Sequence, residues 1–254
     1  MGNNFLSDNG SFSNYGLEHL LCFIGCILFI GTILYLGKYQ WTESQQKLFI
    51  TIVCAFGAFT QLFKVFYKSY AGIFDQANDI PLHLCNIMTL IMPFIMWFKW
   101  RGIWAITFFW IIAGCAQSIF TPTLTESLPH YEAIRYWAVH AVIILGALYG
   151  LFVYGYKLTI GDAVKSVFGM NLLAMFLYPV NVSLGANYMY LNDKPPGKTF
   201  YDLLGPWPDY ILVLEVMILI FFSLILLPFY WHRIKSLITI NKTLIPVFTL
   251  SALF

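Results

Sequence analysis

The sequence predicts an all-α membrane protein, built as a single bundle of about seven transmembrane helices. Hydrophobic residues make up 59% of the 254 residues and charged residues only 10%, against about 25% charged in a typical soluble chain. The mean hydropathy is +0.73. Seven apolar runs approach the roughly 20 residues that an α-helix needs to cross a bilayer, and the connections between them are short. We therefore expect one bundle and no second soluble domain.

The expected elements follow in order along the chain. Residues 1–16 form a polar extracytoplasmic tail without Lys or Arg; because a signal peptide starts with positive charge, we expect the first span to be retained. The seven-helix transmembrane domain covers residues 17–232, and residues 233–254 form a basic and then apolar C-terminal tail. The predicted spans are residues 17–37, 48–67, 82–98, 103–120, 134–154, 163–179 and 210–231.

Basic residues predict the orientation of the bundle. Lysines and arginines are more frequent after the odd-numbered spans and near the C-terminus than on the opposite side. By the positive-inside rule, we expect the N-terminus outside and the C-terminus in the cytoplasm of a multi-pass protein of the cell membrane. The net charge of +2 gives no reason to expect nucleic acid. The cysteines are five, an odd number, and lie within apolar runs, which argues against a disulfide framework.

Polar residues gather in the outer half of the expected bundle. Such side chains are costly in lipid and normally face the bundle interior, a cavity or a reaction centre. Taken alone, each has an ordinary structural explanation: a lysine extending to the interface, amides bonding between helices, a buried structural histidine. Together they favour a functional site. They are Gln61 and Lys64 of the second span, His83, Cys85 and Asn86 of the third, Gln117 of the fourth, Arg135, Tyr136 and His140 of the fifth, and Glu215 of the seventh.

Helical geometry suggests roles within this layer. His83 and Cys85 lie about 200° apart on an ideal helix, which makes His140 the better base for the Cys85 thiol. Tyr136, one turn before His140, and Glu215 are alternative partners to orient the imidazole. Asn86 or Gln117 would donate a hydrogen bond to an oxyanion. In the fourth predicted span, one helical stripe carries Gly114, Gln117, Ser118 and Thr121.

The connection before the last span is rich in Pro, Gly and aromatic residues. One interpretation is a rigid interfacial loop with Trp207 at headgroup level. The alternative is a lid over the polar layer, which would bring Asn187 and Asp202 near the site.

Two segments also resemble a known family. Leu82-His-Leu-Cys85, and Asn187-Tyr-Met-Tyr-Leu followed by Lys194-Pro-Pro-Gly and Asp202-Leu-Leu-Gly-Pro-Trp-Pro208, resemble the YwaF family of bacterial integral membrane proteins. That family is similar to a vertebrate transmembrane family of ether-phospholipid acyltransferases and, more distantly, to androgen-induced-gene-type hydrolases of fatty-acid esters of hydroxy fatty acids. These families use an intramembrane Cys or Thr nucleophile and a His on another span. The resemblance implies Cys85 as nucleophile and His140 as base, with a membrane phospholipid or fatty-acyl lipid as substrate.

Three functions therefore compete. The first is a lipid acyltransferase or lipid-ester hydrolase acting in the outer leaflet. The second is a non-catalytic transporter or a receptor for a small ligand or lipid, with the same polar layer as its binding site. The third, a zinc or haem site made from His83, Cys85, His140 and Glu215, ranks last because no dense ligand motif supports it. We expect no cofactor, no metal and no obligate protein partner, and the absence of Lys from residues 210–231 excludes a retinal Schiff base there.

Overall fold

The structure of the chain is a computed structural model that describes residues 5–6, 10–195 and 200–250. Parts of three predicted features lie outside the described residues: residues 1–4 and 7–9 of the N-terminal tail, residues 196–199 of the proline- and glycine-rich connection, and residues 251–254 of the C-terminal tail.

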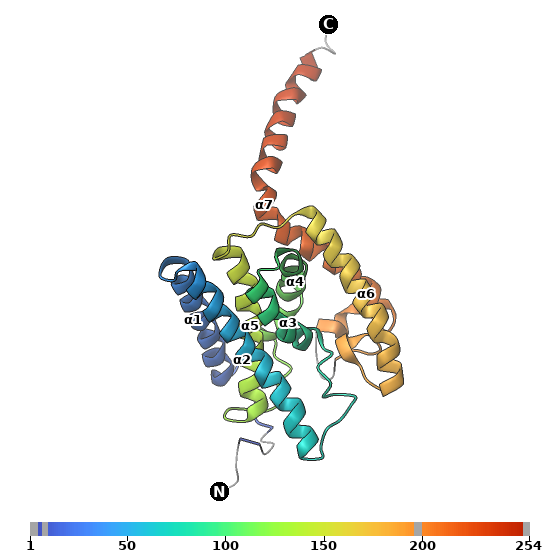
Figure 1. Cartoon of the computed structure of the whole chain (residues 1–254). Helices are drawn as coiled ribbons and strands as arrows, with labels where there is room; N and C mark the ends of the chain where they lie inside the picture. The colour runs from blue at the N-terminus through green and yellow to red at the C-terminus, as the bar shows by residue number, and fades with distance from the viewer. Residues whose placement is uncertain (1–4, 7–9, 196–199, 251–254) are drawn as a thin grey trace.

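All regular secondary structure in the described chain is helical, as predicted (Figure 1). Five of its helices are long and apolar enough to cross a membrane: α1, α2, α5, α6 and α7. Two more, α3 and α4, are apolar but shorter, with 15 and 13 residues. The count of seven spans and their orientation stay predictions. The α-helices are α1 (Leu17–Tyr39), α2 (Glu43–Tyr70), α3 (Leu84–Phe98), α4 (Arg101–Ala113), α5 (Tyr131–Phe152), α6 (Ile160–Leu184) and α7 (Asp209–Leu250), and the 3-10 helices are η1 (Cys115–Ile119), η2 (Tyr188–Tyr190) and η3 (Phe200–Leu204).

Local sequence signals explain several helix ends. Thr42 begins α2 with a capping box, in which its hydroxyl accepts from the backbone N–H of Gln45 and the Gln45 side chain accepts from the Thr42 N–H. Thr159 and Asp162 make the same exchange at the start of α6. Two guanidinium nitrogens of Arg101 donate hydrogen bonds to the two carboxylate oxygens of Asp162, at 2.7 and 2.6 Å. This pair connects the start of α4 to the start of α6.

The fourth predicted span is wrong at its far end. The α-helix stops at Ala113, not at Phe120, and the 3-10 helix η1 replaces its last turns. Gly114, a poor helix former, directly follows the last residue of α4. Pro122 prevents a helix from continuing beyond η1, because proline has no N–H to donate and disfavours helical geometry in the residue before it. The predicted α-helical stripe from Gly114 to Thr121 is therefore not formed.

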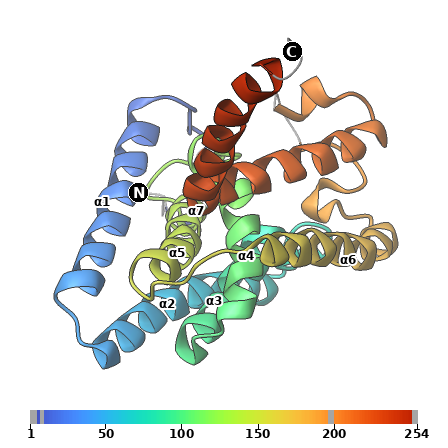
Figure 2. The same ribbon diagram turned by 90° about the horizontal axis from the view of Figure 1, so that it is seen from above.

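Helix α5 is the central helix of the bundle. It packs against α1, α2, α3 and α4, while α6 and α7 pack on α4; Figure 2 shows α1 and α6 on opposite sides of α4 and α5. Small residues permit the close approach. A Cβ atom added to Gly57 of α2 would lie 3.0 Å from Val142 of α5 and 3.4 Å from Thr89 of α3. Because α2, α3 and α5 meet at Gly57, this contact determines which residues of the three helices lie at the same depth in the bundle.

The two ends of the chain differ from the predicted tails. Before α1, the backbone N–H of Phe12 donates to the Thr125 carbonyl (3.0 Å), and the Asn14 side chain donates to the Pro122 carbonyl (3.1 Å). This segment therefore lies along the connection between η1 and α5. At the other end, α7 runs on to Leu250, past the predicted end of the last span, and Figure 1 shows that its final part points away from the bundle.

Candidate functional site

The candidate site lies where α2 ends and where α3 and α5 begin. Cys85 is the second residue of α3, and its thiol is close enough to interact with the side chains of Cys115, in η1, and His140, in α5. Cys115 is buried, whereas Cys85 is only partly buried. Three segments far apart in the sequence thus bring two thiols and an imidazole together, and one of the two cysteines, Cys85, is only partly buried.

The orientation of His140 is set by Tyr136. The Nδ1 atom of His140 lies 2.7 Å from the backbone carbonyl oxygen of Tyr136, one turn earlier in α5. A carbonyl oxygen can only accept, so Nδ1 carries the proton and Nε2 keeps its lone pair. The Tyr136 ring packs on the imidazole, with 4.3 Å between the ring centroids. Its hydroxyl donates to the Ser118 carbonyl (3.0 Å) and accepts from the Thr123 N–H (3.3 Å), which anchors the ring to the end of η1.

The position of Cys85 at a helix start has electrostatic consequences. The first N–H groups of a helix have no carbonyl partner one turn earlier and create a region of positive potential. In α3, the N–H groups of Asn86 and Ile87 bond to the His83 carbonyl, and those of Leu84 and Cys85 have no backbone acceptor within the described residues. A thiolate at Cys85, or an oxyanion beside it, would be stabilised there.

His83 joins the site to the connection between α6 and α7. It is the N-cap residue of α3, but its side chain makes no cap hydrogen bond. Instead, its Nδ1 atom accepts a 3.4 Å hydrogen bond from the Met189 N–H. The rings of Tyr188 and Tyr190 pack against the His83 imidazole, with centroids 5.3 and 5.4 Å away. Tyr190 is also close enough to Cys85 to interact with it electrostatically.

Two asparagines fold this connection into a compact structure. Asn181, fully buried in α6, accepts from the Tyr188 N–H and donates to the Tyr188 carbonyl, both at 2.9 Å. Asn187 accepts from the backbone N–H groups of Asn192 and Asp193 and donates to the Asp193 carbonyl. Asn187 therefore shapes the loop that covers His83. Asp202 lies in η3, further along the same connection.

A cluster of charged side chains adjoins His83 on the α2 and α5 side. Lys64 lies 3.1 Å from Asp79 and 3.7 Å from Glu132, and Lys68 lies 2.7 Å from Asp79. Arg135 bonds to Glu132 through Nε and through the second guanidinium nitrogen, at 2.9 and 2.8 Å. Its remaining nitrogen donates to the Oε1 atom of Gln61 at 2.7 Å, while the buried Nε2 atom of Gln61 has no partner among the described residues. We call these six residues the charged cluster.

The other predicted residues are placed differently. Glu215 accepts a 3.2 Å hydrogen bond from Asn171 of α6, which orients it toward that helix. Gln117 is exposed and donates to the Ala113 carbonyl at 3.0 Å. Asn86 directly follows Cys85, and its side chain has no hydrogen bond in the part of the chain that the structure describes.

The structure adds four residues to the site that the sequence did not predict: Cys115, Tyr190, Asp79 and Glu132. The sequence contained a signal for Asp79 and Glu132, because two cations in a membrane protein, Lys64 and Arg135, need carboxylate partners.

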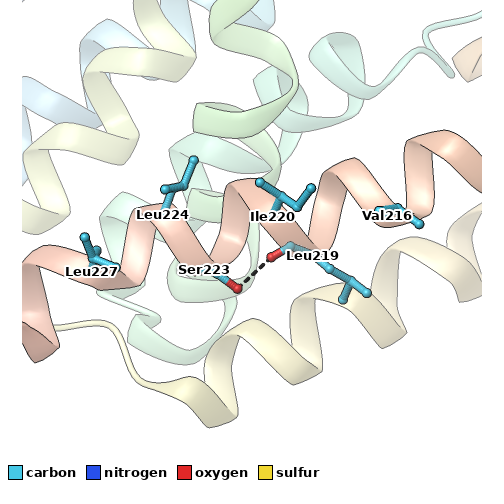
Figure 3. A pocket seen from close by; sticks show the side chains of 6 residues that line it. All are labelled: Val216, Leu219, Ile220, Ser223, Leu224 and Leu227. Atoms are coloured by element: carbon cyan, nitrogen blue, oxygen red, sulfur yellow. Dashed lines mark hydrogen bonds between the residues drawn. The ribbon is translucent and has the colours of Figure 1, made fainter. Parts of the chain in front are cut away.

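Two open grooves lie on the surface of α7. One, of about 350 Å³, is shown in Figure 3 and holds only aliphatic side chains besides Ser223, whose hydroxyl donates back to the Leu219 carbonyl. The other, of about 380 Å³, is lined by residues of α6, the connection and α7, among them Leu191 and Trp207. Neither groove is lined by an Asp, Glu, His, Lys or Arg side chain. In the described ranges there is also no group of three or more His, Cys, Asp or Glu that could hold a metal ion.

Comparison with known proteins identifies the family. A family model, that of the TMEM164 family, matches residues 14–226. No curated protein and no solved structure matches the chain. The matched range contains α1 to α6, the first part of α7 and every residue of the site described above. The chain therefore belongs to the TMEM164 family and is an integral membrane protein.

Proposed function

We propose that the protein is a membrane-embedded enzyme that transfers or hydrolyses fatty-acyl groups of membrane lipids, with Cys85 as nucleophile and His140 as base. The observation that carries this proposal is that the thiol of the partly buried Cys85 lies close enough to interact with an imidazole whose Nδ1 is held by a backbone carbonyl. That arrangement leaves the Nε2 lone pair to take a proton, which is the pairing that activates cysteine nucleophiles.

The first half of the reaction forms a thioester. His140 Nε2 takes the Cys85 proton, and the thiolate attacks the ester carbonyl of the acyl lipid. The tetrahedral intermediate then collapses as the ester C–O bond breaks. The departing alkoxide receives the proton from His140, so the products are an acyl-Cys85 thioester and a lipid alcohol.

The second half regenerates the enzyme. His140 removes a proton from the hydroxyl of an acceptor, which attacks the thioester carbonyl, and the Cys85 thiolate leaves and is reprotonated. With a lysolipid hydroxyl as acceptor, the net reaction is acyl transfer; with water, it is hydrolysis. Both reactions use the same two side chains and need no cofactor.

The oxyanion of the tetrahedral intermediate is stabilised by N–H groups at the start of α3. The N–H of Cys85 and the neighbouring first-turn N–H of Leu84 have no acceptor within the helix, and the Asn86 amide follows directly. Preorganised donors of this kind each contribute about 10²–10³ in rate in acyl-transfer enzymes. The apolar groove beside Leu191 and Trp207 offers a surface for an acyl chain near the connection that covers His83.

The test uses purified protein in lipid, with isotope-labelled phospholipid as donor and lysophospholipid as acceptor, followed by mass spectrometry. Wild type should produce labelled diacyl lipid or free fatty acid. Cys85→Ala should abolish turnover, and His140→Ala should lower it by about 10²-fold or more. Cys22→Ala, a cysteine-to-alanine change at another partly buried thiol, serves as the control and should leave turnover unchanged.

A second readout identifies the intermediate. Intact-mass analysis after brief exposure to donor lipid should show one acyl adduct on wild type and on Cys22→Ala, and none on Cys85→Ala. Undiminished turnover by Cys85→Ala would overturn the proposal, as would an acyl adduct mapped to another residue.

A further inference from the structure

The charged cluster holds more hydrogen-bond donors than it uses. Gln61 is fully buried, and neither N–H of its Nε2 atom has a partner in the part of the chain that the structure describes. Arg135 has five N–H groups, of which the hydrogen bonds to Glu132 and Gln61 use three. Lys64 adds an ammonium group on a side chain that is only 12% exposed. A buried donor without an acceptor costs about 1–3 kcal/mol, so this surplus points to an acceptor that completes the cluster.

The cluster also carries surplus positive charge. Its cations are Lys64, Lys68 and Arg135 and its carboxylates are Asp79 and Glu132, which leaves one positive charge. Nearby Asp75 does not neutralise it well, because Asp75 is exposed and its carboxylate already accepts from Ala77 and Asn78. An uncompensated charge among buried groups is costly, so the expected acceptor is an anion.

The helix packing places this surplus at the depth of Cys85. Gly57 of α2 meets Thr89 of α3, and the two helices run in opposite directions at this contact. One turn further along α2 is Gln61, and one turn earlier in α3 is Cys85, so these two residues lie at the same level. His83 connects them as well, because it is close enough to interact with both Lys64 and Cys85.

We propose that Gln61, Lys64 and Arg135 form a binding site for a phosphate group, and that its ligand is the headgroup phosphate of a membrane phospholipid. A phosphodiester carries one negative charge, which balances the cluster, and its oxygens accept from several donors at once. This assignment rests on the proposed function in one respect only: the lipid bound here is the one whose acyl ester reaches Cys85. It makes the substrate a phospholipid rather than a neutral glyceride.

The test measures lipid binding in the absence of turnover. In Cys85→Ala protein, the Kd of 1-oleoyl-lysophosphatidylcholine is compared with that of 1-oleoylglycerol, which has the same acyl chain and no phosphate. Gln61→Glu keeps the oxygen that accepts from Arg135 but replaces the free donors with negative charge. Gln76→Glu, the same change at an exposed residue near this end of the bundle, is the matched control.

Gln61→Glu should weaken lysophospholipid binding by about tenfold or more, the loss of one charge-assisted hydrogen bond, and leave monoacylglycerol binding unchanged. Gln76→Glu should change neither. Lys64→Gln gives a second variant, with Lys165→Gln on the exposed face of α6 as its control. Equal effects of Gln61→Glu and Gln76→Glu, or equal losses for both lipids, would overturn the phosphate site.

Competition with inorganic phosphate distinguishes a site for the phosphate of a lipid headgroup from a site for the free phosphate ion. Competition by phosphate, but not by chloride at the same ionic strength, would show that the cluster binds the free ion as well as the lipid. A Gln61 effect without such competition would assign the site to phosphate held within a lipid. The binding arms lack Cys85 and so do not depend on turnover. Phosphate-dependent binding in these arms, together with no turnover by wild type, would refute the proposed function alone. Turnover by Gln61→Glu with Cys85 intact, and with an unaltered lipid preference, would refute the site alone.

Discussion

The Nδ1 atom of His140 lies 2.7 Å from the carbonyl oxygen of Tyr136, and this backbone contact decides which nitrogen of the imidazole is free. Since the acceptor is a main-chain atom of the same helix, no side-chain substitution removes it without disturbing α5. A carboxylate is the more common partner for such a histidine, and Glu215 was the sequence-based candidate. The structure pairs Glu215 with Asn171 instead, so His140 is oriented by its own helix and by the Tyr136 ring.

Thiol alkylation should report this arrangement directly. Cys85 and Cys22 are both partly buried, whereas Cys26, Cys54 and Cys115 are buried. We expect Cys85 to react fastest with a membrane-permeant maleimide, because a nearby base makes the thiolate available. His140→Ala should slow labelling of Cys85 by about tenfold or more and leave Cys22 unaffected. Equal slowing at both thiols, measured by peptide mass spectrometry, would mean that the substitution changes access rather than activation.

Asn181 should be essential for the connection that covers His83. Its side chain satisfies both backbone groups of Tyr188, deep in the protein. Asn181→Ala leaves those groups without partners, so we expect a loss of about 1–3 kcal/mol in unfolding free energy and weaker lipid turnover. Ser183→Ala, at an exposed position of the same helix where the hydroxyl bonds only to the Val180 carbonyl of that helix, is the control for thermal unfolding. Equal melting temperatures for the two variants would contradict this role.

Close helix packing predicts the effect of a single methyl group. A Cβ atom at Gly150 of α5 would lie 2.2 Å from the Nε1 atom of Trp104, which donates to the Ala147 carbonyl at 3.1 Å. Gly150→Ala must therefore displace a buried indole, and we expect destabilisation of about 1–3 kcal/mol. At Gly102 nothing lies within 4 Å of an added Cβ atom, so Gly102→Ala should be neutral or slightly stabilising. A melting temperature of Gly150→Ala at or above that of Gly102→Ala would show that α5 is less tightly packed.

The charged cluster should make stability depend on acidity. Burial raises the pKa of Asp79, which is only 2% exposed, but the hydrogen bonds from Lys68 and the Asp75 backbone and the charge of Lys64 lower it more, so the net pKa lies below its usual value. The ionised carboxylate thus stabilises the folded protein above the unfolded pKa of about 4, and this contribution is lost as pH falls through the lower, folded pKa.

The measurement is the melting temperature between about pH 6 and pH 3 for wild type and Asp79→Asn. Wild type should be the more stable at pH 6, and the difference should shrink on acidification, because Asn cannot be protonated. Parallel curves over this range would place the origin of the acid sensitivity elsewhere.

Several features were determined by the sequence alone. An apolar composition interrupted by short polar connections leaves few solutions other than helices, because backbone groups in lipid must be bonded within their own segment. The starts of α2 and α6 were also encoded locally, since Thr42 and Thr159 cap them with the residue three positions later. The gathering of Gln61, Lys64 and Arg135 at one level follows from alternating helix direction, which the order of the apolar runs already implies.

Other features depend on contacts between distant segments, which only the tertiary structure decided. The end of α4 at Ala113 placed Cys115 in a 3-10 turn beside Cys85, whereas a continued helix would have directed it elsewhere. The partners of Lys64 come from the loop after α2 and from α5, and those of His83 come from a connection about a hundred residues later. Side-chain pairing of this kind is set by the relative position of packed helices, a property that hydropathy and local capping do not contain.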